Sequence, residues 1–248
     1  MNPNHTRFWE NQFVPLGVLL ATGLIVVGAI VSVTAISIKN ASNTISVTGS
    51  ATTQVSADTA KWTVSAARSV LEDGIPAATT VVIGDVTKIS MFFKNAGIAE
   101  DAITLGVVHT DQDYSYSQDA NVPKRYIVRQ DVTVSSNDPA RIQQLAQNLS
   151  ALTNQGVIFS IQDPQYYVST LPDLRISLIG EAVKDAKMRT EQIVKNTGQS
   201  VGRLQSASSG VVQVLAGDSV DVSDYGTYDT STIDKKVMVT IRATFFVK

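Results

Sequence analysis

The first hydrophobic feature of the chain is an uncharged run near its N-terminus. From Phe13 to Ile38 there are 26 consecutive residues without a charged side chain, between Glu10 and Lys39. A helix rises about 1.5 Å per residue, so such a run can cross the roughly 30 Å hydrocarbon layer of a membrane. The pattern predicts a tail at residues 1–12, a transmembrane helix at 13–38 and a linker at 39–43.

Two alternatives to a retained membrane anchor remain open. Small residues at Ser32–Ala35 offer a site where a signal peptidase could cut. The apolar run exceeds the 7–15 residues typical of a signal peptide, which favours retention. A buried core helix is the other alternative, and the length of the run argues against it. Arg7 and Lys39 give only a weak orientation signal, and we expect the N-terminus inside because the large domain that follows has the character of an exported one.

In the rest of the chain, 44–248, the spacing of apolar residues changes between two periods. A two-residue period predicts strands, whereas apolar residues at three- and four-residue steps predict amphipathic helices. The strands expected are around Ile45–Val55, Trp62–Ala66, Ile103–Val107, Tyr126–Val134, Val157–Ile161, Leu204–Val214 and Val237–Val247. The helices expected are Glu72–Asn95, a helix capped by Asn137 or Asp138 that ends near Gly156, and a helix from Pro172–Asp173 that ends at Gly198. This order of strands, helix, hairpin, helix, strand, helix and hairpin is α+β in class.

Composition excludes several kinds of chemistry. Charged residues make up 17% of the chain, and beyond Lys39 there are 18 basic and 21 acidic residues. No basic surface for nucleic acid is therefore expected. The chain contains no cysteine, which excludes a disulfide framework, a thiolate metal site and a thiol nucleophile.

Short motifs are distributed from Thr44 to the C-terminus: Ile45–Gly49, Ala57–Ala60, Asn95–Ile98 leading into Ala102–Thr104, Glu181–Glu191 with Gly198 and Gly202–Leu204, and Val237–Ile241. Together these motifs resemble the SIMPL-domain family of bacterial envelope proteins, whose biochemical function is undefined. Two features depart from the family pattern: Ala57 stands where relatives often have proline, and the first helix has the character of a retained anchor where many relatives carry a cleavable signal.

The resemblance implies an envelope location, self-assembly into large oligomers as in some relatives, and an association with oxidative stress. It supplies no catalytic residues. With four methionines and no cysteine, a thiol-based protective mechanism is excluded and sacrificial methionine oxidation is weakly supported.

Candidate catalytic residues are few. His5 precedes the predicted membrane helix, so His109 is the one imidazole in the main domain, and no partner for it can be named from sequence. One hypothesis, the least favoured, is an unrecognised hydrolase that uses His109, Asp58 or Asp111. We expect no enzyme, and we assign no catalytic, cofactor-binding or metal-binding residue.

Two polar tracts and several tyrosines have alternative explanations. The acidic tracts lack the glycine-containing spacing of a calcium loop, so solvated loops or subunit contacts are favoured over cation sites. Tyrosines suit interfaces because one end is apolar and the other forms hydrogen bonds, but they also fill half-buried strand positions. The acidic residues are Asp111, Asp113 and Asp119, and Asp218, Asp221 and Asp224, and the tyrosines are Tyr114, Tyr116, Tyr126, Tyr166, Tyr167, Tyr225 and Tyr228.

These observations predict a protein of the bacterial inner membrane whose main domain faces the periplasm or the cell exterior. Its expected partners are the lipid bilayer and further copies of itself, in a ring or scaffold. A monomeric module that binds a ligand or a protein partner is the alternative.

Overall fold

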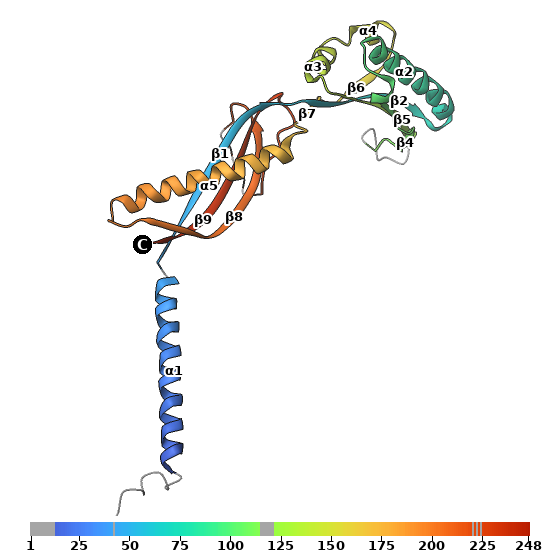
Figure 1. Ribbon diagram of the computed structural model, residues 1–248. Helices are drawn as coiled ribbons and strands as arrows, with labels where there is room; N and C mark the ends of the chain where they lie inside the picture. The colour runs from blue at the N-terminus through green and yellow to red at the C-terminus, as the bar shows by residue number, and fades with distance from the viewer. Residues whose placement is uncertain (1–12, 42, 115–121, 220, 222, 224) are drawn as a thin grey trace, which may run out of the picture. The chain divides into compact units, whose positions relative to one another are not determined.

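The computed structural model describes residues 13–41, 43–114, 122–219, 221, 223 and 225–248 (Figure 1). The chain divides into two compact units. The first comprises Met1–Gly49, Val183–Ser208 and Ile241–Lys248, and the second comprises Ser50–Ala182 and Ser209–Thr240. Helices and strands are mixed along the chain, so the predicted α+β class is confirmed.

Helix α1 (Phe13–Ala41) occupies the uncharged N-terminal run. Its segment Val14–Ser37 is long and apolar enough to span a membrane, and none of this segment is buried against protein. The hydroxyls of Thr22 and Thr34 each donate to the carbonyl four residues earlier, at 2.7 and 2.8 Å, so these polar groups are satisfied within the helix. Such internal pairing is what a helix surrounded by lipid requires.

A three-stranded sheet has the order β1-β9-β8, formed by β1 (Thr44–Ser56), β9 (Asp234–Val247) and β8 (Val201–Ala216). The backbones of Ser200 and Lys248 exchange hydrogen bonds of 2.8 and 3.0 Å, so β8 and β9 are antiparallel there. The central strand is buried on one face, as its two-residue period predicts. The buried residues of β9 are Lys235, Val237, Val239, Ile241, Ala243 and Phe245.

Helix α5 (Leu171–Lys195) buries a narrow stripe at strict four-residue spacing. The members of the stripe are Leu178, Ala182, Ala186, Thr190 and Val194. Small side chains in its middle permit a close approach between the helix and whatever it packs on. In the first unit, Ile193 and Val194 line the same surface groove as Thr44 and Ile45, so this part of α5 lies along β1.

The second sheet lies wholly in the second unit. Its main order is β3 (Ile103–Leu105), β5 (Arg125–Ser136), β2 (Thr59–Leu71) and β6 (Phe159–Ile161), with β4 (His109–Gln112) pairing β5 and β7 (Gln165–Tyr167) pairing β2. Strands β2 and β5 form a long antiparallel pair, in register from Ala60 opposite Ser136 to Leu71 opposite Arg125.

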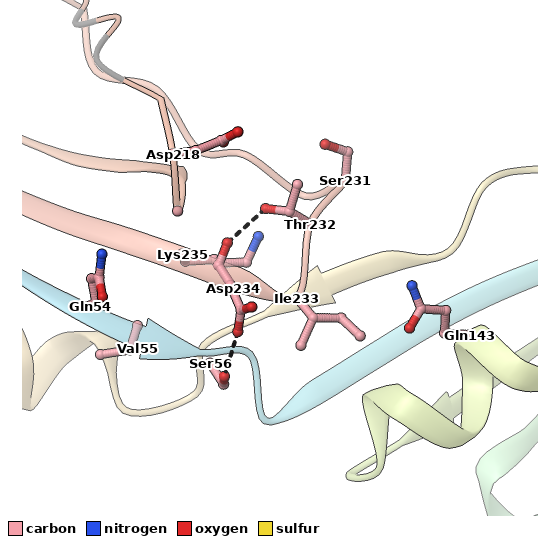
Figure 2. Close-up of a pocket in the computed structure, with 11 residues that line it drawn as sticks. Gln54, Val55, Ser56, Gln143, Asp218, Ser231, Thr232, Ile233, Asp234 and Lys235 are labelled. Atoms are coloured by element: carbon pink, nitrogen blue, oxygen red, sulfur yellow. Dashed lines mark hydrogen bonds between the residues drawn. The ribbon is translucent and has the colours of Figure 1, made fainter.

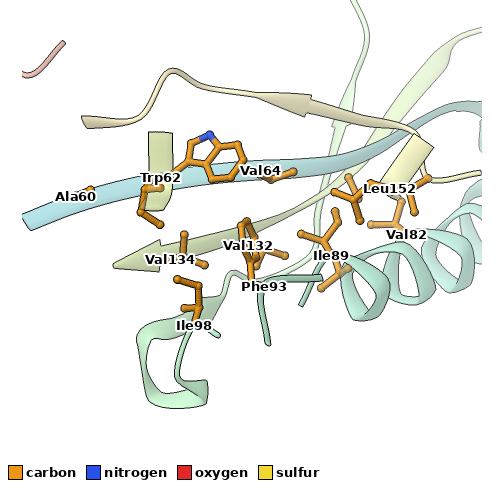
Figure 3. Close-up of a cluster of buried hydrophobic side chains, with 14 of the residues drawn as sticks. Ala60, Trp62, Val64, Val82, Ile89, Phe93, Ile98, Val132, Val134 and Leu152 are labelled. Carbon is orange, nitrogen blue, oxygen red and sulfur yellow. The ribbon is translucent and has the colours of Figure 1, made fainter. Parts of the chain in front are cut away.

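Helix α2 (Ile75–Asn95) packs on β2 and β5 and closes the main core (Figure 3). The rings of Trp62 and Phe93 meet edge to face with centroids 5.4 Å apart, and the Trp62 indole N–H donates to the carbonyl of Gln162 at 2.9 Å. Short helices α3 (Pro139–Gln147) and α4 (Ser150–Asn154) add Ile142 and Leu152 to this core. Helix α2 also meets the length and composition of a membrane span, but its apolar stripe is used in this core.

One ion pair is buried beneath α2. The guanidinium of Arg68 on β2 pairs with the carboxylate of Asp85, which is 3% exposed, and also donates to the carbonyl of Ile158 at 3.1 Å. Lys88 lies 3.5 Å from the same carboxylate. The charges are therefore compensated, as buried charges must be.

The structure corrects several predicted boundaries. The helix expected from Pro139 to Gly156 is two helices, because the chain leaves helical geometry at Asn148 and Leu149. The strand expected through Val107 ends at Leu105, and pairing with β5 resumes at His109. Strand β7 was not predicted, since three residues are too few to show a period. The 3-10 turns Glu72–Gly74 and Glu100–Ala102 flank α2 and β3.

Candidate functional site

An open cleft of about 1080 Å³ lies in the second unit (Figure 2). Its lining includes the apolar side chains of Val55 and Ile233. The polar lining consists of Gln54 and Ser56 from β1, Gln143 from α3, and Asp218, Ser231, Thr232, Asp234 and Lys235 from β9 and the segment before it. Amide, hydroxyl and carboxylate groups of this kind can bind a polar ligand through hydrogen bonds.

The charge balance of the cleft depends on where Lys235 directs its ammonium. That side chain has no exposed surface, and its ammonium donates to the backbone oxygen of Asp229 at 2.6 Å and to the Asp229 carboxylate at 3.0 Å. The positive charge is thus held inside the protein, while Asp218 and Asp234 are exposed. The open part of the cleft therefore favours neutral or cationic ligands over anions.

Asp229 organises the turn beside the cleft. Its carboxylate accepts from the hydroxyls of Ser231 and Thr232 at 2.6 and 2.5 Å, in addition to Lys235. Burial alone would raise the pKa of Asp229, but these hydrogen bonds to its charged form outweigh burial and hold the pKa well below its usual range. The carboxylate is fully occupied, so its role is structural.

Asp58 has a similar structural role at the start of β2. Its carboxylate accepts from the Ser169 backbone N–H at 2.9 Å, from the Ser169 hydroxyl at 2.7 Å and from the Thr59 hydroxyl at 3.1 Å. Burial would raise the pKa of Asp58, but the bonds from Ser169 and Thr59 lower it overall. The hydrolase hypothesis used Asp58 as a catalytic carboxylate. In the structure, the Asp58 carboxylate instead connects the start of β2 to the segment before α5 through its hydrogen bonds with Ser169.

Among the residues that the structure describes, no hydrogen bond or ion pair joins the sole imidazole of the main domain to a catalytic partner. His109 is exposed on β4, directly opposite Arg129 of β5. Asp111 is exposed on the same strand, opposite Ile127. The geometry therefore gives no support to a triad built on His109.

The two acidic tracts do not form a cation site in the part of the chain that the structure describes. No group of three or more His, Cys, Asp or Glu side chains is placed to hold a metal there. Asp218 lines the cleft and Asp221 is exposed elsewhere on the loop. Asp119 and Asp224 lie outside the described residues.

The tyrosines separate into three kinds. Tyr166 is buried, and Tyr126 is half-buried in β5. The rings of Tyr167 and Tyr228 are tilted by 39° with centroids 6.0 Å apart, and the Tyr228 hydroxyl accepts from the Val168 N–H at 3.0 Å. Tyr225 is 96% exposed and Tyr114 is 68% exposed, so these two remain candidates for an interface. Tyr116 lies outside the described residues.

The outer edges of the three-stranded sheet form a second candidate surface. Strands β1 and β8 stand at the two ends of the strand order, and among the described strands none is paired to their outer sides. Every residue from Arg203 to Val211 is exposed. Farther along β8 the edge is covered, because the Val214 N–H donates to the Thr227 carbonyl at 2.7 Å and the Asp229 N–H donates to the Val214 carbonyl at 2.7 Å.

Both edges lack the charges that usually protect such strands. No charged residue occurs from Asn40 to Ala57 or from Leu204 to Gly217. Soluble proteins ordinarily place lysine, proline or a bulge on an exposed edge to prevent pairing with another chain. The uncharged edges were visible in the sequence, but only the sheet order shows that these two segments are the ones without outer neighbours.

Sequence reasoning also missed Lys235 and Asp229. The missed signal is periodic: Lys235 falls in the same alternate positions as Val237 and Val239, which predicts a buried lysine and hence a buried partner. The partner itself could not be named, because the loop that supplies Asp229 has no periodic pattern.

Comparison with known proteins gives one result that covers most of the chain. The family model SIMPL, described as "Protein of unknown function (DUF541)", matches residues 45–245. No curated protein matches the chain. The match begins at the second residue of β1 and ends within β9, so it includes nearly all of both sheets and the residues that line the cleft. The suspected resemblance is confirmed, and this chain belongs to the SIMPL family.

Proposed function

We propose that this protein is anchored in the bacterial inner membrane by α1 and that its extracytoplasmic part self-assembles into a homo-oligomer. Its role is that of a non-enzymatic envelope scaffold. The family has no defined biochemical activity, and the candidate catalytic residues Asp58 and His109 lie in structural or isolated positions.

The pair of open, uncharged sheet edges is the observation that carries this proposal. Strands β1 and β8 are 13 and 16 residues long, whereas an average strand has about 5–6. Each presents backbone N–H and C=O groups that another strand can satisfy, and Arg203 at the start of β8 is the one charged residue in the two strands. Self-assembly satisfies these groups and removes the risk of non-specific aggregation.

Helix α1 supports the membrane part of the proposal. A span of 24 residues from Val14 to Ser37 with no burial against protein has its apolar surface available for lipid. Strand β1 begins shortly after α1 and contains no charged residue, which is compatible with a position near the membrane surface.

The first experiment measures the mass of the full-length protein extracted in mild detergent and determines its N-terminal sequence. We expect a uniform particle of several copies whose chains retain residues that precede Phe13. A monomer that begins after Ala35 would contradict both the anchor and the assembly.

A pair of lysine variants tests the anchor separately. Leu24→Lys places a charge in the middle of the span, where insertion costs about 2.5–3.5 kcal/mol, and we expect part of the protein to leave the membrane fraction. Ser37→Lys places the same charge at the end of the span, where the side chain reaches the interface, and should leave the membrane fraction unchanged. Equal behaviour of the two variants would argue against a spanning helix.

The cleft of the second unit favours a second candidate function, a module that binds a neutral or cationic polar ligand. A thermal-shift screen of sugars, amino acids and polyamines on the full-length protein tests it. Any stabilising compound should lose its effect in Gln143→Ala, which lines the cleft, and keep it in Gln144→Ala, which is exposed on the same helix but outside the lining. A compound that stabilises Gln143→Ala and Gln144→Ala to the same extent does not bind in the cleft.

A further inference from the structure

Charged side chains are distributed unequally between the two compact units. Beyond Ala41, the first unit contains seven basic and two acidic side chains, whereas the second unit contains 11 basic and 19 acidic ones. The net side-chain charge is therefore +5 in this part of the first unit and −8 in the second unit. The near-neutral composition of the whole chain conceals this separation, because each unit combines segments that are distant in sequence.

The two acidic side chains of the first unit are already paired on α5. The Arg189 guanidinium lies 2.8 Å from the Asp185 carboxylate, and the Lys187 ammonium lies 3.8 Å from the Glu191 carboxylate. The other five basic residues of the unit are exposed and take part in none of the ion pairs formed among the described residues. These five are Lys184, Lys195, Arg203, Arg242 and Lys248.

Two of these basic residues lie at the end of the unit where β1 begins. The Asn43 carbonyl accepts from the N–H of Val247, which precedes Lys248, at 2.9 Å. Asn43 also lines a surface groove together with Val194, which precedes Lys195 at the end of α5. Both lysines are therefore close to the start of β1.

Arg203 and an exposed apolar side chain lie at the same end. The backbones of Ser200 and Lys248 exchange hydrogen bonds of 2.8 and 3.0 Å, and the Arg203 guanidinium lies 5.0 Å from the centre of the Phe246 ring. Ile193, which is 50% exposed, lines the same groove as the start of β1. Basic side chains next to exposed apolar surface are typical of regions that lie at a membrane interface. We call Lys195, Arg203 and Lys248 the basic end of the first unit.

The short connection to α1 keeps the basic end close to the apolar span that ends at Ser37. Helix α1 ends at Ala41 and β1 begins at Thr44. Because a helix rises about 1.5 Å per residue and an extended chain advances at most about 3.6 Å, Thr44 lies within about 17 Å of Ser37. Lipid headgroups occupy the first 5 to 8 Å or so beyond the hydrocarbon, and attraction between charges extends about 8–10 Å further in physiological salt. Lys39, in the last turn of α1, adds another positive charge in this region.

We infer that the basic end of the first unit docks on anionic phospholipid headgroups of the membrane in which α1 is anchored. This inference rests on the proposed anchor and adds a second contact with the bilayer. Each basic residue near an anionic membrane surface strengthens binding about fivefold, so three together favour the docked state about 100-fold. The same surface repels the acidic second unit, so the attraction selects the first unit.

Docking at a second point has a consequence for assembly. Association of two proteins costs rotational and translational freedom. A first unit held both by α1 and by the headgroups has already lost part of that freedom. Every copy then presents its β1 and β8 edges at the same height above the bilayer, which favours contact between neighbouring copies.

The absence of cysteine from the chain allows a single-site probe. Full-length protein with Asn196→Cys, an exposed position next to Lys195, is labelled with a fluorophore. It is reconstituted into vesicles of phosphatidylcholine, or of equal parts of phosphatidylcholine and anionic phosphatidylglycerol. Both kinds of vesicle contain a lipid with a nitroxide on its headgroup, which quenches a fluorophore that lies close to the membrane surface. Flotation of the same vesicles after alkaline extraction measures the anchor separately.

We expect stronger quenching in the anionic vesicles than in the neutral ones. Raising the salt concentration from about 0.1 M to about 1 M shortens the Debye length from about 10 Å to about 3 Å and should remove the difference. The difference should also be lost when the basic end is neutralised by Lys195→Gln, Arg203→Gln and Lys248→Gln together. The matched control removes three exposed positive charges from the second unit and should keep the difference; it combines Lys61→Gln, Lys124→Gln and Arg175→Gln.

The outcomes separate the docking from the anchor. Equal quenching in the two kinds of vesicle, with protein that still floats after alkaline extraction, would overturn the docking and leave the anchor intact. Protein that no longer floats would refute the anchor and the docking together. Loss of the lipid dependence in both triple variants would assign it to overall charge and would also overturn the inference.

Two further measurements complete the test. The salt series uses no charge variant, so it remains decisive if circular dichroism shows that the triple variant of the basic end is misfolded. A heparin titration examines a soluble polyanion as the alternative partner. Quenching that is equal in the two lipids, combined with heparin binding that is lost when the basic end is neutralised, would overturn docking on lipid in favour of that partner.

Discussion

The ammonium of Lys235, which has no exposed surface, lies 3.0 Å from the carboxylate of Asp229. Removing one partner of such a pair leaves an uncompensated buried charge and typically costs about 3–5 kcal/mol. We therefore expect Asp229→Asn to lower the free energy of unfolding by an amount near the lower end of that range, since the asparagine oxygen retains part of the contact. Urea unfolding followed by the fluorescence of buried Trp62 measures it.

The same pair offers an internal control. Asp229→Asn combined with Lys235→Met removes both charges, and the double variant should recover part of the lost stability because no unpaired ammonium remains. Asp101→Asn, an exposed aspartate next to β3, should change stability by less than about 0.5 kcal/mol. A double variant less stable than Asp229→Asn alone would show that Lys235 has another partner.

Stability should also depend on pH through Asp229. Its folded-state pKa is lowered, so its contribution is fully present above the unfolded-state value of about 3.9 and is lost as the pH falls toward the folded-state pKa. We expect the free energy of unfolding to fall below about pH 4 and the fall to be shallower in Asp229→Asn. Equal slopes in the two proteins between pH 2 and pH 4 would assign the acid sensitivity to other carboxylates.

Asp58 connects the start of β2 to Ser169, two residues before α5, through two hydrogen bonds. Each hydrogen bond to a charged group contributes about 1.5–3 kcal/mol, and solvent at this exposed site reduces that amount. We expect Asp58→Ala to cost about 2 kcal/mol and Ser169→Ala, which keeps the backbone N–H bond, to cost about 1 kcal/mol. Thermal unfolding measures both, with exposed Asp73→Ala as the control.

If Asp58 instead served catalysis, Asp58→Ala would be as stable as the parent protein. The combination of normal stability with lost turnover of an ester or phosphate substrate would reopen the hydrolase hypothesis. Reduced stability without any turnover in the parent protein supports the structural role.

Periodicity accounts for the parts of the fold that the sequence predicted. The buried positions Val82, Val86, Ile89 and Phe93 define α2, and the alternation of β9 follows directly from its residues. The short β7 depends on contacts with a distant segment, such as the pairing of Tyr167 with Thr59. Contacts of this kind have no local signal, so they could not be predicted.

The features of the candidate sites also divide into those that the sequence predicts and those that depend on the fold. The apolar N-terminal helix, which is long enough to span a membrane, and the absence of thiol chemistry follow directly from the sequence. The cleft brings Gln54, Gln143 and Asp218 together from three distant segments, and the open edges depend on strand order. Neither arrangement can be inferred until the segments are placed in the fold.

Gly202 tests whether the β8 and β9 hairpin requires close backbone approach. A Cβ atom added at Gly202 would lie 2.9 Å from the carbonyl oxygen and 3.2 Å from the Cβ of Phe246, so Gly202→Ala must displace backbone. We expect a loss of about 1–3 kcal/mol, detected as faster hydrogen exchange at the amides of Ser200 and Lys248. Gly84→Ala is the matched control, because its added Cβ in α2 meets nothing within 4 Å and alanine is the better helix former by about 0.5–1 kcal/mol. Protection at Ser200 and Lys248 that survives Gly202→Ala would show that the hairpin admits a side chain at this position without losing these hydrogen bonds.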